Sequence, residues 1–200
     1  MVKHMKKIAE IFSVPKSNKI FISILTIVAL ISGALFFFKL SLDDQTLIKT
    51  YIENLIINND YNSLITILGI NFLLILIIYL FGLSVIGINI NLFIYYVKIF
   101  ILSLEITAIL NLLKTQGILI SFINVFPHQI INLFVFAVLV IYSINLSFAF
   151  IVSIIKKESF SLSNIMKSYN KIFFISIILI TITVLYEYFL LPIILKLVLN

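Results

Sequence analysis

Residues 61–97 read YNSLITILGINFLLILIIYLFGLSVIGININLFIYYV, a run of 37 residues without a charged side chain. One helix needs about 20 apolar residues to cross the hydrocarbon core of a bilayer, so this run is long enough for two crossings. Its near-continuous Ile, Leu and Phe content lacks the strict alternation of a membrane β-barrel strand. The run therefore predicts an all-α fold, a polytopic helical membrane protein.

The rest of the chain has the same character. Three further charge-free runs cover residues 20–38, 115–155 and 172–186. The whole chain is 62% hydrophobic and 11% charged, against about 25% charged residues in an ordinary soluble domain. We therefore expect residues 1–200 to form a single integral membrane domain, with no room for a soluble catalytic domain.

Two breaks divide the longest runs. Gly82 and Gly87 bracket a short polar interruption within 61–97, which favours a tight turn. Pro127 interrupts 115–155, because the residue before a proline is biased away from helix. The second break leaves two alternatives: two spans, or a shallow segment at 117–126, re-entrant or lying along the surface, followed by one span.

The lysines decide between these alternatives, since cytoplasmic loops carry an excess of positive charge. The five-span count takes the N-terminus as cytoplasmic and Lys98 as lying near the cytoplasmic end of the third span. This arrangement places ten lysines inside and four outside. Six spans would place seven on each side. We predict five spans with the C-terminus outside. After a basic cytoplasmic tail at 1–19, they lie near residues 20–38, 62–82, 89–111, 128–153 and 172–192.

Two segments outside the spans have apolar residues at helical spacing. In 41–57, Ser41 and Asp44 form a capping-box pattern, followed by an apolar face drawn from residues 47–56. This pattern predicts a short helix on the outer leaflet. Residues 162–169 show the same pattern beside lysines, which predicts a second surface helix on the inner, anionic leaflet.

Ionisable residues inside the spans are costly and so are the candidates for a function. Glu105 is expected about midway along the third span, as a proton or cation site or as a protonated group hydrogen-bonded within the bundle. Lys98 lies two turns back on the same helix face. Glu187 is expected near the outer end of the last span, before Pro192, which should end that helix.

No pattern for catalysis or metal binding is present in the sequence. His128 follows Pro127, but the polar residues near it are the amides Gln129 and Asn132, so a capping or hydrogen-bonding role is expected instead of a metal site. The chain has no Cys, no phosphate-binding loop and no serine beside a histidine and an acid. We expect no enzyme activity and no cofactor. All 14 cations are lysines that cluster at span ends, so nucleic acid is not an expected partner.

Taken in order, these features resemble the stage II sporulation protein M family of polytopic bacterial membrane proteins. The resemblance covers roughly residues 20–197 and departs from the family pattern at Ile99, Ser103, Gln129 and Asn132. It is carried by Gly33 in the first span, the segment from Gly82 to Gly87, Lys98, the sequence Phe126-Pro127-His128, and Tyr186-Glu187 leading to Leu191-Pro192.

The resemblance implies a noncatalytic membrane scaffold of endospore formation, located in the mother-cell membrane at the sporulation septum. Its partners would be membrane lipid and two peptidoglycan hydrolases, the stage II sporulation proteins D and P, which thin the septal wall during engulfment. Residues 41–57 and 187–192 are the expected external contacts. The alternative is a permease-like transporter subunit with Glu105 as its ion or proton site and 162–169 docking an ATPase. The sequence leaves the oligomeric state open, a homo-oligomer included.

Overall fold

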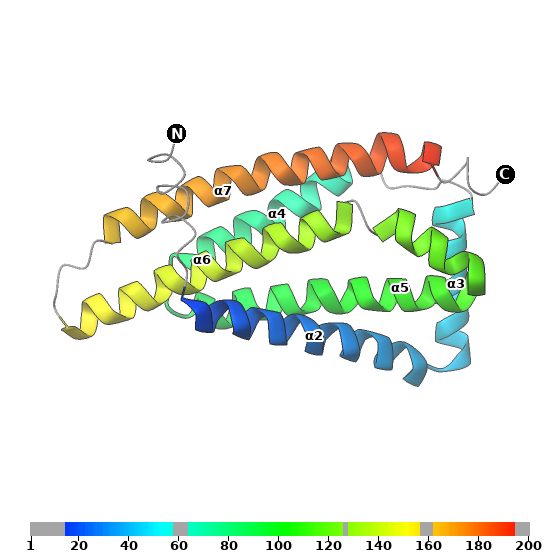
Figure 1. The fold of residues 1–200 in the computed structure, drawn as a ribbon, viewed down its shortest axis with the longest axis horizontal. Coiled ribbons are helices and arrows are strands. Elements are labelled where there is room, and N and C mark those ends of the chain that lie inside the picture. Colours follow the sequence, from blue (N-terminus) through cyan, green and yellow to red (C-terminus); the bar gives the residue numbers. More distant parts are fainter. Residues whose placement is uncertain (1–14, 58–63, 126–127, 157–161, 195–200) are drawn as a thin grey trace.

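The computed structural model describes residues 15–57, 64–125, 128–156 and 162–194, and these ranges form a bundle of long helices without a β-strand (Figure 1). The predicted all-α class is confirmed. Pro127 lies outside the described residues. The elements are α2 (Lys16–Lys39), α3 (Leu42–Ile57), α4 (Leu64–Gly82), α5 (Gly87–Val125), α6 (His128–Lys156), α7 (Leu162–Leu185) and the π-helix η1 (Tyr186–Leu190).

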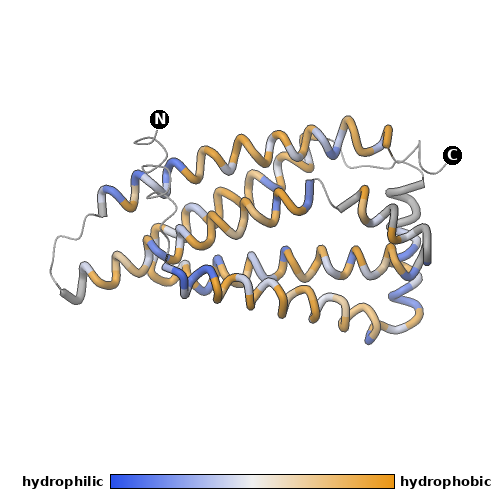
Figure 2. The backbone as a smooth tube through the Cα atoms, viewed as in Figure 1, coloured by the Kyte–Doolittle hydropathy of each residue, from blue (hydrophilic) through white to orange (hydrophobic). Residues whose placement is uncertain are grey.

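Five helical segments within the described ranges are long and apolar enough to cross a membrane, as the sequence predicts. Large apolar side chains are exposed on the outside of the bundle, where lipid would contact them. Hydrophilic residues gather toward the two ends of the bundle (Figure 2). The start of α2 and the end of α7 lie at opposite ends of the bundle (Figure 1), as an odd number of spans requires. The chain is a multi-pass membrane protein. Its spans are Lys16–Lys39, Leu64–Gly82, Gly87–Asn111, His128–Ser153 and Ser163–Ile194.

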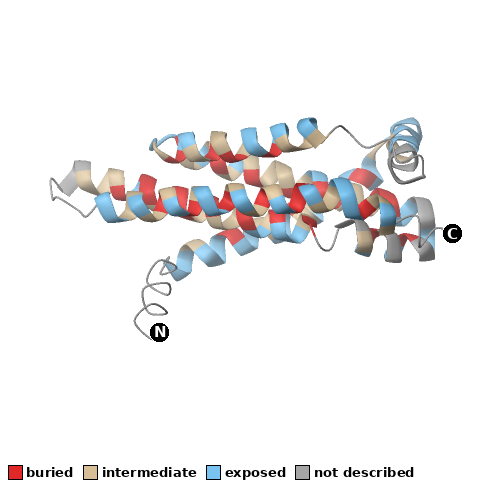
Figure 3. Cartoon of the chain, turned by 90° about the horizontal axis from the view of Figure 1, so that it is seen from above, coloured by how far each residue is buried: buried red, intermediate tan, exposed pale blue. Residues whose placement is uncertain are grey.

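The first span packs closely against the third. A Cβ atom at Gly33 would lie 2.4 Å from the carbonyl oxygen of Phe100 and 2.8 Å from Cβ of Ser103, so only glycine permits this approach of α2 to α5. The Ser103 hydroxyl donates to the carbonyl of Leu30 across the contact. Buried residues follow the inward faces of the helices (Figure 3). Small and hydroxyl side chains therefore fix the contact between these two spans.

The helix α3 crosses one end of the bundle, which the lysine count predicts to be the outer end and where the sequence places an external helix. Ile48 packs beside the buried cluster that contains Phe37 and Ala108. Leu47 and Tyr51, by contrast, are 69% and 59% exposed. The apolar residues of α3 thus do not form one lipid-facing surface, because part of the predicted face is used to hold the helix on the bundle.

Ser41 caps α3 as predicted. Its hydroxyl accepts a hydrogen bond from the Asp44 backbone N–H at 3.2 Å and donates to the Asp44 carboxylate at 2.6 Å. We expect Ser41→Ala to weaken the first turn of α3 by about 1 kcal/mol, which corresponds to about fivefold faster amide exchange there. Hydrogen exchange measured in lipid nanodiscs would test this. Unchanged exchange in the first turn, with exchange in α2 as the internal control, would contradict the capping role.

The helix α5 reverses direction at Lys114, whose φ of 48° and ψ of −119° are not helical. Ile109 and Ile123 belong to the same packed cluster, which one straight helix would not allow. Figure 1 shows residues 115–125 returning from the outer end toward the start of α6. The segment that the sequence leaves as either re-entrant or superficial therefore folds back against the bundle.

Two expectations for the last span are wrong. Residues 162–169 do not form a separate surface helix, because α7 runs without interruption from Leu162 and Tyr169 is fully buried in the bundle. Pro192 does not end the helix, which continues to Ile194. The missing N–H of Pro192 is accommodated by a wider π-turn, in which the Leu191 N–H bonds to the Tyr186 carbonyl.

Candidate functional site

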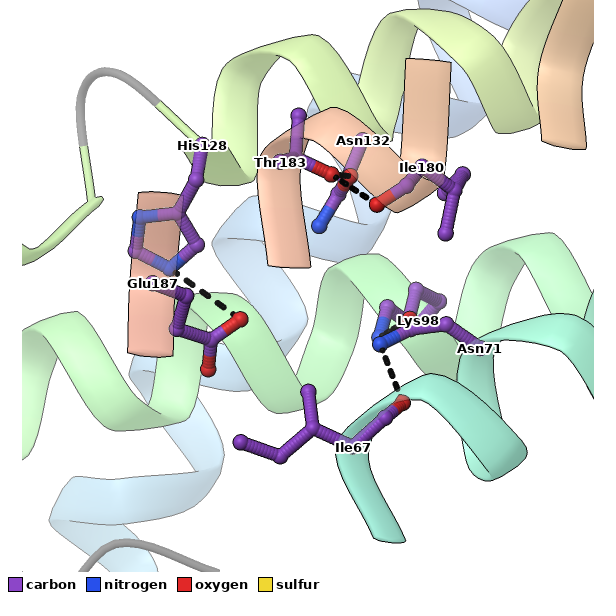
Figure 4. Close-up of polar contacts among 8 residues, drawn as sticks. All are labelled: Ile67, Asn71, Lys98, His128, Asn132, Ile180, Thr183 and Glu187. Carbon is purple, nitrogen blue, oxygen red and sulfur yellow. Dashed lines mark hydrogen bonds and ion pairs between the residues drawn. The ribbon is translucent and has the colours of Figure 1, made fainter. Parts of the chain in front are cut away.

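Four of the candidate residues interact electrostatically in the part of the bundle between its middle and its outer end. Lys98 and Glu105 come from α5, His128 from the first residue of α6, and Glu187 from η1. Nε2 of His128 lies 3.9 Å from Oε2 of Glu187 (Figure 4). Lys98 interacts electrostatically with both glutamates, and Glu187 also interacts with Glu105. We refer to these four residues as the charged cluster.

The depth of the two α5 residues differs from the sequence expectation. Lys98 lies eleven residues after Gly87 and thirteen before Asn111, near the middle of the span and not near its cytoplasmic end. Glu105 lies six residues before Asn111, in the outer part of the span and not at its midpoint. With Lys98 set aside, the predicted count becomes nine lysines inside against four outside, so the predicted orientation is unchanged.

The Lys98 ammonium group is stabilised by polar and aromatic partners within the bundle. Its Nζ lies 3.4 Å from Oδ1 of Asn71 on α4 and 5.7 Å from the ring centroid of Phe136 on α6. The amide of Asn71 donates in turn to the Ile67 carbonyl at 3.0 Å (Figure 4). A charge at this depth is costly, and an amide oxygen and a ring face offset part of that cost.

His128 is held almost completely out of solvent. It is 2% exposed, and its ring lies 6.1 Å from the Tyr186 ring. Its Nδ1 has no hydrogen-bond partner within the part of the chain that the structure describes. The imidazole thus faces Glu187 through Nε2. The contact found within the described residues is with this carboxylate, and the capping or hydrogen-bonding role of His128 stays a prediction.

A second polar contact joins α6 to α7 one turn deeper. The Thr183 hydroxyl donates to Oδ1 of Asn132, and both side chains are buried (Figure 4). Sequence reasoning did not select Asn71, Asn132 or Thr183 as site residues. The available signal was the presence of amides within otherwise apolar runs, where each buried amide needs a partner.

Gly82 and Gly87 lie at the opposite, inner end and are not part of the charged cluster. A Cβ atom at Gly87 would lie 1.7 Å from the Phe81 carbonyl oxygen, so the turn between α4 and α5 requires glycine there. At Gly82 a Cβ atom would lie 2.1 Å from the Tyr169 hydroxyl. Both predicted glycines are therefore structural residues of the inner turn.

The carbonyl groups at the end of α4 are satisfied by side chains from three other helices. Asn91 donates to the Ile78 carbonyl at 2.9 Å, and Tyr169 donates to the same carbonyl at 3.0 Å and to that of Tyr79 at 3.2 Å. Ser147 donates to the Gly82 carbonyl at 3.3 Å and, just beyond the helix, to the Ser84 carbonyl at 2.9 Å. Because a helix end leaves its last carbonyls without intrahelical partners, these donors allow α4 to end against apolar surroundings.

The charged cluster combines side chains of opposite charge. No group of three His, Asp or Glu side chains within the described ranges is placed to hold a metal ion. It is instead an arrangement of one cation, two carboxyl groups and an imidazole, which can exchange protons and fix the packing of α5, α6 and η1. No family model matches the chain, and no curated protein or solved structure gives a significant match.

Proposed function

We propose that the chain is a non-enzymatic membrane scaffold of endospore formation, which recruits and positions peptidoglycan hydrolases in the mother-cell membrane at the septum. The hydrolases are the stage II sporulation proteins D and P, as the resemblance to the stage II sporulation protein M family implies. The observation that supports this role best is the position of α3 across the predicted outer end, with Leu47 and Tyr51 exposed.

The helix α3 is well fixed for such a role. Ile48 packs on the bundle, and the Gln45 side chain donates to the Leu40 carbonyl at 3.1 Å. Leu47 and Tyr51 are one turn apart and outside the spans, so they form a small apolar surface that a partner on the outer side can reach. Tyrosine is among the side chains that often dominate the binding energy of an interface.

The proposal is tested by pull-down of tagged protein from sporulating cells in mild detergent. We expect the double variant Leu47→Asn, Tyr51→Asn to recover at least about tenfold less hydrolase, since two central apolar contacts are worth more than about 1.4 kcal/mol. The double variant Thr46→Asn, Thr50→Asn changes exposed residues of the same helix and is the matched control. Equal recovery from both variants would show that α3 is not the recruiting surface.

The charged cluster supports a second candidate, a permease-like subunit of a transporter. Ionisable side chains within spans commonly mark ion or proton pathways. The test is Glu105→Gln, a neutral isostere. Loss of function with normal membrane insertion and normal hydrolase recovery would favour transport, whereas a scaffold should tolerate the change. Recovery of an ATPase in place of hydrolases would also favour the transporter.

A further inference from the structure

Exposed apolar side chains form a continuous stripe along α7. Phe174, Ile178 and Ile182 are exposed, and their spacing of four residues places them on one face of the helix. Ile172 and Ile180, which lie toward the opposite face, are buried in the bundle. The packing of α7 therefore directs this stripe outward, where lipid would contact it.

Two lysines continue the stripe at the predicted inner end of the helix. Lys171 precedes Phe174 by three residues and Lys167 precedes Lys171 by four, so both lie on the face of the stripe, and both are exposed. Within the described residues, neither lysine forms an ion pair. Figure 2 shows the same change from hydrophilic first turns of α7 to apolar residues beyond them. A ligand in contact with the stripe can therefore also reach two ammonium groups.

The length of the last span places these lysines at the level of the lipid headgroups. The helix continues from Lys171 to Ile194, which corresponds to about 35 Å, slightly more than the roughly 30 Å of the hydrocarbon core. Lys167 lies one turn farther out, by about 6 Å. The start of α7 also reaches beyond the start of α2 along the bundle (Figure 1). A lipid whose acyl chain lies along the stripe thus has its phosphate near both lysines.

An anionic phospholipid matches both parts of this surface. Its headgroup is negatively charged, and lysines at a membrane surface attract anionic lipids. The lysine side chains are long and flexible, so two ammonium groups one turn apart can contact the same phosphate. Asn164, exposed three residues before Lys167, adds an amide that can hydrogen-bond to the headgroup. A soluble anion would match the lysines but would gain nothing from the apolar stripe.

We propose that α7 binds one anionic phospholipid molecule, with the phosphate held by Lys167 and Lys171 and an acyl chain along Phe174, Ile178 and Ile182. The lipid lies beside a helix that crosses the membrane, and not beneath a helix on the membrane surface. The site is at the end of the bundle opposite α3 (Figure 1), and it does not rest on either proposed function.

Tryptophan fluorescence tests the proposal, because the chain contains no tryptophan and Phe174→Trp would place a single one within the site. The full chain carrying this substitution is reconstituted in phosphatidylcholine bilayers with an increasing fraction of phosphatidylglycerol, and one of the two lipids has brominated acyl chains that quench tryptophan on contact. The quenching gives the binding constant of phosphatidylglycerol relative to phosphatidylcholine beside residue 174. We expect a preference of at least about fivefold, since one lysine near the surface is worth roughly that factor.

Two double variants in the Phe174→Trp background then identify the residues responsible. Lys167→Gln, Lys171→Gln should reduce the preference to near one. Lys16→Gln, Lys39→Gln removes the same charge from exposed positions of α2 and should leave the preference unchanged. Quenching by brominated phosphatidylcholine, together with gel filtration, confirms that each variant is folded and inserted.

Each of the other outcomes contradicts the proposal. Equal binding of the two lipids beside residue 174 would show that the lysines do not select a headgroup. A preference that survives the loss of Lys167 and Lys171 would assign the lipid to another part of the surface. Equal losses in both double variants would reduce the effect to net charge. Displacement of the lipid by added glycerol phosphate would indicate a site for a free phosphate anion instead.

Discussion

Gly82→Val is expected to prevent formation of a stable bundle, whereas Gly69→Val should have little effect. A Cβ atom at position 82 would lie 2.1 Å from the Tyr169 hydroxyl and 2.8 Å from the Ser143 hydroxyl oxygen, while one at position 69 meets nothing within 4 Å. Gly69 lies in the interior of α4 and Gly82 is its last residue, so the change in helix propensity is no larger at position 82. The difference between the two variants therefore reports the packing at the inner end.

The loss at Gly82 combines two effects. The added side chain displaces Tyr169, and the carbonyl groups of Ile78 and Tyr79 then lose a donor in a region where water cannot replace it. Overpacking adds its own cost, so we expect a total of more than about 3 kcal/mol. The measurement is the monodisperse fraction and the melting temperature in detergent.

Tyr169→Phe provides an intermediate case for the same network. It removes the donor without adding volume, so a loss of about 1–3 kcal/mol is expected. If Gly82→Val and Gly69→Val had equal melting temperatures, or if Tyr169→Phe were neutral, the hydrogen bonds at the end of α4 would not contribute to stability as described.

Much of this fold could be predicted from the sequence because the strongest signals are local. The charge-free runs predict the spans, and the glycines around 82–87 predict a turn. The pair Ser41 and Asp44 predicts the start of α3. The beginning of α7 could not be predicted in the same way. An amphipathic pattern at 162–169 has the same period whether its apolar face meets lipid or, as Tyr169 shows, another helix.

The individual residues of the candidate site could be predicted from the sequence, but the contacts between them could not. Lys98, Glu105, His128 and Glu187 were identified because ionisable residues are rare in spans. That His128 faces Glu187 depends on how α6 packs against η1, and on a π-turn that no local pattern indicates. Asn71, Asn132 and Thr183 are not predicted as site residues, because an uncharged polar residue hardly changes the hydropathy of a long apolar run.

Lys98→Met is expected to lower the melting temperature by about 10 °C, because it removes the cation that stabilises two carboxyl groups within the bundle. Loss of such a cation within the bundle is expected to cost about 3 kcal/mol, the lower end of the range for breaking a buried ion pair. Methionine keeps most of the apolar length of the lysine side chain, so little packing is lost. Lys167→Met, at an exposed position of α7, is the control and should change stability by less than about 0.5 kcal/mol.

Further substitution at the carboxyl groups then distinguishes charge from packing as the origin of the loss. If charge balance is the cause, adding Glu187→Gln to Lys98→Met removes one uncompensated carboxylate and should recover part of the stability. Adding Glu105→Gln as well leaves the cluster without net charge and should recover most of it. The effects of substitutions within one network on stability are not additive, so a second substitution can recover stability that the first one removed. If Lys98 acts through packing, each added substitution should leave the melting temperature unchanged or lower it further. Melting temperatures that do not rise with the added substitutions would therefore contradict the charge-balance argument.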